Sequence, residues 1–137
     1  GHGAFPIGGL AGGKAEAAAR FRYYIRSNKI VIMLVTTTST VEGRPVQEYL
    51  GVVNAQSIIG ANIFKDLFAG LRDVFGGRSK TYERVLEEAK EDAMRELVER
   101  AQSLGANGIL GVDLDFETVG AGGSMLMVIA TGTAVRL

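Results

Sequence analysis

The chain has 137 residues, no cysteine and a formal net charge of zero, and 47% of its residues are hydrophobic. This length fits one domain whose core needs no disulfides. The absence of cysteine excludes disulfides, thiol nucleophiles and thiolate metal sites, and it agrees with a cytoplasmic location. No apolar run reaches the roughly 18 residues that a membrane-spanning helix needs, so we expect no membrane contact.

The charges are divided unevenly along the chain. Residues 1–32 carry five basic side chains and one acidic side chain, a net charge of +4. The remaining 105 residues carry ten basic and fourteen acidic side chains, a net charge of −4. A basic segment favours contact with an anionic surface. The nearest such surface is the acidic body or a second copy of it, so we expect self-association and no nucleic-acid partner.

The first 32 residues differ in composition from those that follow. They open with a Gly-His pair typical of tag cleavage, and residues 3–13 are rich in glycine, which favours a flexible segment. Residues 14–26 favour a helix, because KAEAAAR contains the strongest helix formers and Phe21 and Ile25 lie four positions apart. The same stretch is similar to linkers used in engineered fusions. We predict a basic arm with a short helix, of native or engineered origin, that contacts a neighbouring subunit.

The rest of the chain predicts an α+β fold in the order β-β-α-α-β-β. Residues 41–45 have the composition of a turn, and residues 120–123 that of an antiparallel hairpin turn. The two helices are predicted from apolar residues at helical spacing, between glycines or polar capping residues. We predict strands at residues 30–38, 46–58, 108–118 and 125–135, and helices at about 62–75 and 81–104.

An acidic row is predicted in the strand at residues 108–118. Apolar and acidic residues alternate there, so Asp113, Asp115 and Glu117 share one face, and Leu110, Val112, Leu114 and Phe116 share the other. The Cα atoms of successive acidic residues are expected roughly 6.6–6.8 Å apart. Such a row could offer oxygen ligands to calcium or magnesium, although the spacing is wide for one ion to bind all three carboxylates. The alternatives are a solvated face and a row paired with basic residues of a neighbouring subunit.

Several segments together resemble the YbjQ-like family, whose members carry a heavy-metal-binding label without an established activity. The matching segments are MLVTTTSTVEG (33–43), EYLGVV (48–53), GANIFKDLFAGLRDVFGGRS (60–79), LGANGILGVDLDFETVG (104–120), GSMLMV (123–128) and GTAV (132–135). The resemblance implies a subunit related to the dodecin-like folds and a ring-shaped homopentamer. It divides the chain into residues 33–137, the family domain, and residues 1–32, an extension outside the pattern.

Two further groups of residues are candidates for ligand binding. Gly77, Arg78 and Ser79 precede the second helix, where backbone N–H groups and a guanidinium can hold an anion, and Arg72 lies nearby. Thr36 and Thr38 lie in a hydroxyl-rich strand end that could line an opening or a pocket between subunits. A helix–helix turn and an ordinary threonine-rich strand are the structural alternatives.

The sequence contains few of the side chains that bind heavy metals. Soft metals prefer thiolate or imidazole, but the chain has no cysteine and one histidine, His2. The sequence also contains no Ser/His/Asp or Cys/His catalytic set. We expect a non-enzymatic homo-oligomeric module that binds a small ligand or ion at subunit interfaces. The alternatives are a scaffold whose N-terminal arm drives further assembly, and an enzyme of unknown reaction.

Overall fold

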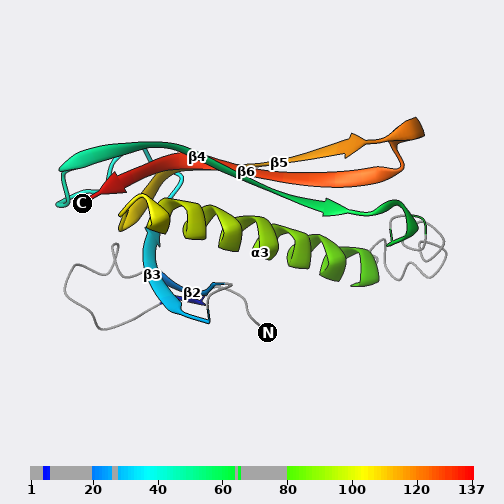
Figure 1. The fold of residues 1–137 in the computed structure, drawn as a ribbon, viewed down its shortest axis with the longest axis horizontal. Helices are drawn as coiled ribbons and strands as arrows, with labels where there is room; N and C mark the ends of the chain where they lie inside the picture. Colours follow the sequence, from blue (N-terminus) through cyan, green and yellow to red (C-terminus); the bar gives the residue numbers. More distant parts are fainter. Residues whose placement is uncertain (1–4, 7–19, 26–27, 64, 66–79) are drawn as a thin grey trace.

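A computed structural model describes residues 5–6, 20–25, 28–63, 65 and 80–137, and it combines α and β structure (Figure 1). The strands form one sheet in the order β1-β2-β3-β5-β6-β4. Residues 61–63 and 65 are also helical. The elements are β1 (Phe5–Pro6), β2 (Arg20–Tyr24), β3 (Ile30–Val35), β4 (Glu48–Ile59), α3 (Lys80–Ser103), β5 (Gly108–Val119), the 3₁₀ turn η2 (Ala121–Gly123) and β6 (Met125–Arg136).

Strands β4, β6 and β5 form an antiparallel sheet that packs against one side of α3 (Figure 1). The side chains of β6 alternate, and those that face the helix are buried, including Leu126, Val128 and Ala130. The buried side chains of α3 include small ones, among them Ala89, Ala93 and Ala101, which are at most 4% exposed. Small residues at both surfaces let the helix lie close to the sheet, and this close packing excludes water from the core.

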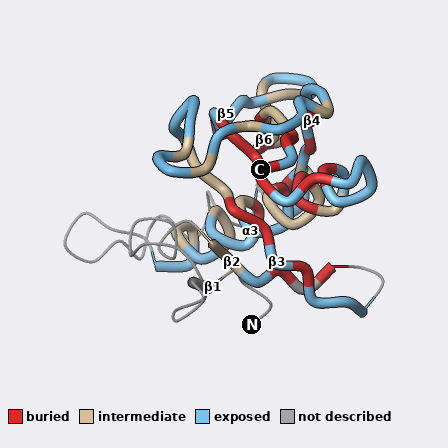
Figure 2. The backbone as a smooth tube through the Cα atoms, turned by 90° about the vertical axis from the view of Figure 1, so that its left-hand side faces the viewer, coloured by how far each residue is buried: buried red, intermediate tan, exposed pale blue. Residues whose placement is uncertain are grey.

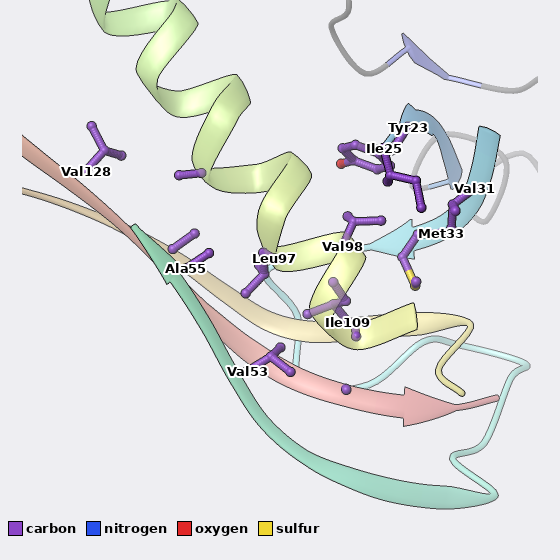
Figure 3. Close-up of a cluster of buried hydrophobic side chains, with 14 of the residues drawn as sticks. Tyr23, Ile25, Val31, Met33, Val53, Ala55, Leu97, Val98, Ile109 and Val128 are labelled. Carbon is purple, nitrogen blue, oxygen red and sulfur yellow. The ribbon is translucent and has the colours of Figure 1, made fainter. Parts of the chain in front are cut away.

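The hairpin of β2 and β3 covers a second side of α3. Strand β2 pairs antiparallel with β3 from Arg20↔Leu34 to Tyr24↔Ile30. Tyr23 and Ile25 of the N-terminal segment are 6% and 3% exposed, and Figure 3 shows them with Val31 on the far side of the helix from Ala55 and Val128. Figure 2 shows buried segments on both sides of α3. The helix is therefore enclosed between two parts of one curled sheet.

The helix expected at residues 14–26 is wrong for its last part, because Arg20–Tyr24 is strand β2. Apolar residues recur here at every second position, at Phe21, Tyr23 and Ile25, which is the strand period. Strand β3 supplies the hydrogen-bonding partner of Arg20–Tyr24, and this pairing outweighs the local helix propensity there. Residues 14–19 lie outside the described part of the chain.

The strands of the family domain follow the predicted order, and the antiparallel hairpin of β5 and β6 is confirmed. The turn at residues 41–45 is confirmed by the hydrogen bond from Arg44 N to Val41 O, 3.1 Å long, with Gly43 at φ +79°. Strands β1 and β2 add to the predicted set. Within the described residues, no helix has the length and apolarity that a membrane crossing requires.

A β-bulge in β5 corrects the predicted alternation. Leu110 pairs with Thr133 but Asp113 pairs with Thr131, so Gly111 and Val112 lie opposite one residue of β6. Gly111 has φ +61°, the left-handed conformation expected at such a bulge. The extra residue shifts the alternation of β5 by one position, so the side chains after the bulge point to the opposite sheet face from the one that the pattern before it predicts. Leu110 therefore packs on the sheet face away from α3, whereas Val112 and Leu114 pack against the main core, contrary to the shared face predicted for all three.

Candidate functional site

Thr36 and Thr38 follow β3 and bind the bulged part of β5 through their backbones. Val112 N donates to Thr36 O over 3.0 Å, and Gly111 N donates to Thr38 O over 2.9 Å. These bonds satisfy the N–H groups that the bulge removes from the regular β5–β6 ladder. The backbone of this segment therefore has a structural role, which is to hold β3 against β5.

The hydroxyl groups of the same threonines bind one another at the surface. The Oγ1 atoms of Thr36 and Thr38 are 2.9 Å apart, and Thr38 Oγ1 donates to Thr40 O over 2.6 Å. Because the Thr38 proton is used in that bond, Thr36 must donate to Thr38. Thr36 Oγ1 in turn accepts from Thr38 N over 3.2 Å. A ligand at this position would meet exposed hydroxyl groups that are already ordered.

The predicted anion site cannot be placed on the structure. Gly77, Arg78, Ser79 and Arg72 all lie outside the described residues. An anion site at the start of the second helix therefore stays a prediction from sequence.

The acidic row lies on the exposed surface of β5, as predicted, since Asp113, Asp115 and Glu117 are all exposed. Their cross-strand neighbours on β6 are Thr131, Ile129 and Met127. A hydrogen bond with Asp113 and repulsion by its charge raise the pKa of Asp115 above its ordinary value, with smaller contributions from desolvation and Glu117. The carboxylate of Asp113 therefore favours the protonated form of Asp115.

The described residues do not fit a heavy-metal centre. Among them, no group of three or more His, Cys, Asp or Glu side chains is arranged to hold a metal ion. The whole sequence has no cysteine, and its one histidine, His2, lies outside the described part. The sequence therefore lacks the thiolate ligands that soft metals prefer, and the described residues lack imidazole ligands as well.

A pocket missed by the sequence analysis lies between α3, β2 and β5. It has a cavity volume of 230 Å³ and is lined by Tyr23, Glu87, Lys90, Glu91, Met94, Arg95 and Leu114. Burial raises the pKa of Tyr23 to about 12, so the phenol stays neutral at physiological pH. The period-two pattern of Phe21, Tyr23 and Ile25 was the one signal that could have placed Tyr23 against the helix.

A second pocket lies where the end of β6 meets the start of β5. It has a cavity volume of 190 Å³ and is lined by Arg20, Ile32, Leu34, Arg44, Asn107 and Leu137. The Asn107 side chain binds the Leu137 backbone twice, accepting from its N–H over 2.7 Å and donating to its oxygen over 3.2 Å. Arg44 Nη2 lies 3.4 Å from the same oxygen. The polar groups of this pocket thus hold the last residue in place.

Strand β4 lies at one edge of the sheet and is apolar for an edge strand. It pairs with β6 on one side and ends the strand order on the other. Tyr49 is 70% exposed, Val52 78% and Ile58 55%. On the unpaired side, Arg100 Nη1 of α3 donates to Asn54 O over 2.8 Å, which occupies one acceptor of the edge. A long apolar edge strand is a common site of pairing with another chain.

Comparison with known proteins identifies relatives of residues 33–137. These residues match the model of the YbjQ family, described as "Putative heavy-metal-binding". A UPF0145 protein of Caulobacter vibrioides, strain NA1000 / CB15N, is 62% identical over 105 residues, and these residues make up 77% of this chain and 100% of the relative. The UPF0145 protein of Caulobacter vibrioides strain ATCC 19089 has the same identity and the same coverages. A crystal structure of a DUF74-family protein with unknown function from Pediococcus pentosaceus superposes with a TM-score of 0.52 at 20% identity, covering 77% of this chain and 97% of that one. This last likeness concerns the fold alone.

Proposed function

The chain belongs to the YbjQ-like family, whose function is not established, and we propose that it is a non-enzymatic module that assembles into a homopentameric ring and binds a small ligand or ion between subunits. The observation that carries the proposal is the exposed apolar surface of edge strand β4, at Tyr49, Val52 and Ile58. Fully burying an aliphatic side chain contributes about 1.5–3 kcal/mol. A neighbouring subunit that covers these three side chains would gain a substantial part of its binding free energy from them.

A complementary edge exists on β5. Among the described residues, β3 and the Thr36–Thr38 segment pair with β5 only as far as Val112. From Asp113 to Val119, β5 pairs with β6 alone, which leaves its other edge open in the described part of the chain. Phe116, 46% exposed, lies in this stretch.

These two edges suit a head-to-tail assembly. The interface would join β4 of one subunit to the outer part of β5 in the next, so the two contacting surfaces differ. Repetition of such an interface closes a ring when the rotation between subunits divides a full turn. Ring closure would satisfy the edge groups of every subunit and remove the free edges that promote aggregation. The exposed hydroxyls of Thr36 and Thr38 are the neutral polar groups that we assign to ligand contact between subunits.

Sedimentation velocity tests the assembly through β4. Val52→Lys places a charge on the most exposed apolar side chain of the edge, and desolvating that charge at an interface opposes association. We expect this variant to sediment as a smaller species than the unaltered chain at equal concentration. The matched control is Gln102→Lys, which places the same charge at an exposed position of α3. If the Val52 and Gln102 variants sediment alike, β4 is not the interface.

A further inference from the structure

The pocket between α3, β2 and β5 has an apolar interior and a charged rim. The Tyr23 ring, Met94 and Leu114 supply the apolar surface. The Tyr23 hydroxyl has no hydrogen-bond partner among the described residues. Because no fully buried side-chain oxygen or nitrogen there lacks a partner, this hydroxyl is not fully buried. The cavity volume of 230 Å³ lies below the range of about 300–1,000 Å³ typical of drug-sized ligands. The occupant must therefore be a small molecule.

The charged side chains on the rim do not all form ion pairs with one another. Four charged side chains of α3 line the pocket, and they are Glu87, Lys90, Glu91 and Arg95. Lys90 Nζ lies 2.8 Å from Glu87 Oε1, and Arg95 Nη1 lies 3.3 Å from Asp92 Oδ1. The Glu91–Arg95 pair that the i, i+4 spacing favours is therefore replaced by Asp92–Arg95. Glu91 has no ion-pair partner among the described residues, which leaves one uncompensated carboxylate at the rim.

We infer that this pocket binds a small organic monocation, an amine carried on an apolar body, with its ammonium group at Glu91 and its body against Tyr23, Met94 and Leu114. The face of the Tyr23 ring also attracts a cation. An anionic ligand would place its charge beside the uncompensated Glu91 carboxylate, and a neutral one would leave that carboxylate without a partner. Charge complementarity thus selects the cation.

The N-terminal extension supplies one wall of this pocket. Tyr23 lies before residue 33, where the match to the family model begins. The Caulobacter relatives are matched over their whole length by 105 residues, so they have no counterpart of a 32-residue extension. The pocket is built within one chain and lies apart from the β4 edge. Amine binding therefore goes beyond the proposed assembly, and either one can fail without the other.

Titration of the full chain with 2-phenylethylamine, followed by ¹H–¹⁵N NMR, tests the inference. Neutral 2-phenylethanol and anionic 3-phenylpropionate serve as matched probes with the same ring. We expect the amine to shift the backbone signals of Tyr23, Met94 and Leu114, and to bind more tightly than either matched probe. Glu91→Gln should weaken amine binding about threefold to tenfold, as for a partly exposed charge pair.

Glu88→Gln is the control variant, because Glu88 is an exposed carboxylate of the same helix that does not line the pocket. Its affinity for the amine should equal that of the unaltered chain. Equal binding of the three probes, signal shifts elsewhere in the chain, or equal affinities of the Glu91 and Glu88 variants would each overturn the inference. The assembly state has its own readout in sedimentation, so the two proposals are tested separately.

Discussion

Replacing Tyr23 by alanine tests whether the N-terminal strand is an integral part of the fold. The side chain is 6% exposed and packs in the main core against α3 (Figure 3). Truncation of a buried aromatic residue costs about 3–5 kcal/mol. We expect a loss near the lower end, about 3 kcal/mol, because the ring also borders a cavity and gives up fewer close contacts.

Two variants of strand β3 calibrate this loss. Val31 is 7% exposed, and Val31→Ala should cost about 2 kcal/mol. Ile30 is 65% exposed on the same hairpin, and Ile30→Ala should change the stability by less than about 0.5 kcal/mol. Urea unfolding followed by far-ultraviolet circular dichroism, at one protein concentration, gives the three free energies. If Tyr23→Ala and Ile30→Ala unfold at the same urea concentration, the Tyr23 side chain of β2 does not contribute to the core as expected.

Two further predictions concern β5 and β6. A Cβ atom at Gly132 would lie 2.6 Å from Ile109 Cγ2 and 3.3 Å from the backbone oxygen of Leu110. Gly132→Ala should therefore destabilise the fold by about 1–3 kcal/mol. An unchanged urea midpoint would argue against the bulge geometry. Because the pKa of Asp115 is raised in the folded chain, the folded chain binds a proton at this carboxyl more tightly than the unfolded chain does. The contribution of Asp115 to the free energy of unfolding is therefore fully present below the ordinary carboxyl pKa, and it is lost as the pH rises through the folded-state pKa. In Asp113→Asn, the pKa of Asp115, measured by NMR titration of its carboxyl carbon, should fall toward the ordinary value, and no fall would show that Asp113 is not the cause.

The elements with a clear period could be predicted from the sequence. The strand predicted at residues 125–135 is β6, Met125–Arg136, and the strand predicted at residues 46–58 is β4, Glu48–Ile59. Each is flanked by glycine or turn residues, and each packs one face against α3, so local pattern and tertiary contacts agree. Strand β2 was missed because its helix-forming neighbours masked a short period-two pattern.

The facing of β5 could not be predicted, because it depends on one backbone conformation. Gly111 at φ +61° adds a residue to the strand, and the sequence does not distinguish a bulge glycine from an ordinary one. Beyond the bulge, Asp113, Asp115 and Glu117 still share the exposed face as predicted. Leu110, before the bulge, packs on the face opposite to the predicted one.

The candidate sites were predicted less well than the fold. Thr36 and Thr38 follow strand β3, which ends at Val35, and the bonds that their backbone oxygens accept from Val112 N and Gly111 N depend on the bulge. The pocket at Tyr23 joins residues that are more than 60 positions apart in the sequence, and no local motif marks it. Such a site becomes visible only when the strand pairing of the N-terminal segment is known.

Native mass spectrometry of the full chain is the most direct test of the proposed ring, because it counts the subunits and retains bound small molecules. The proposal predicts a dominant species of five chains at micromolar protein concentration. A spectrum dominated by single chains under the same conditions would contradict it.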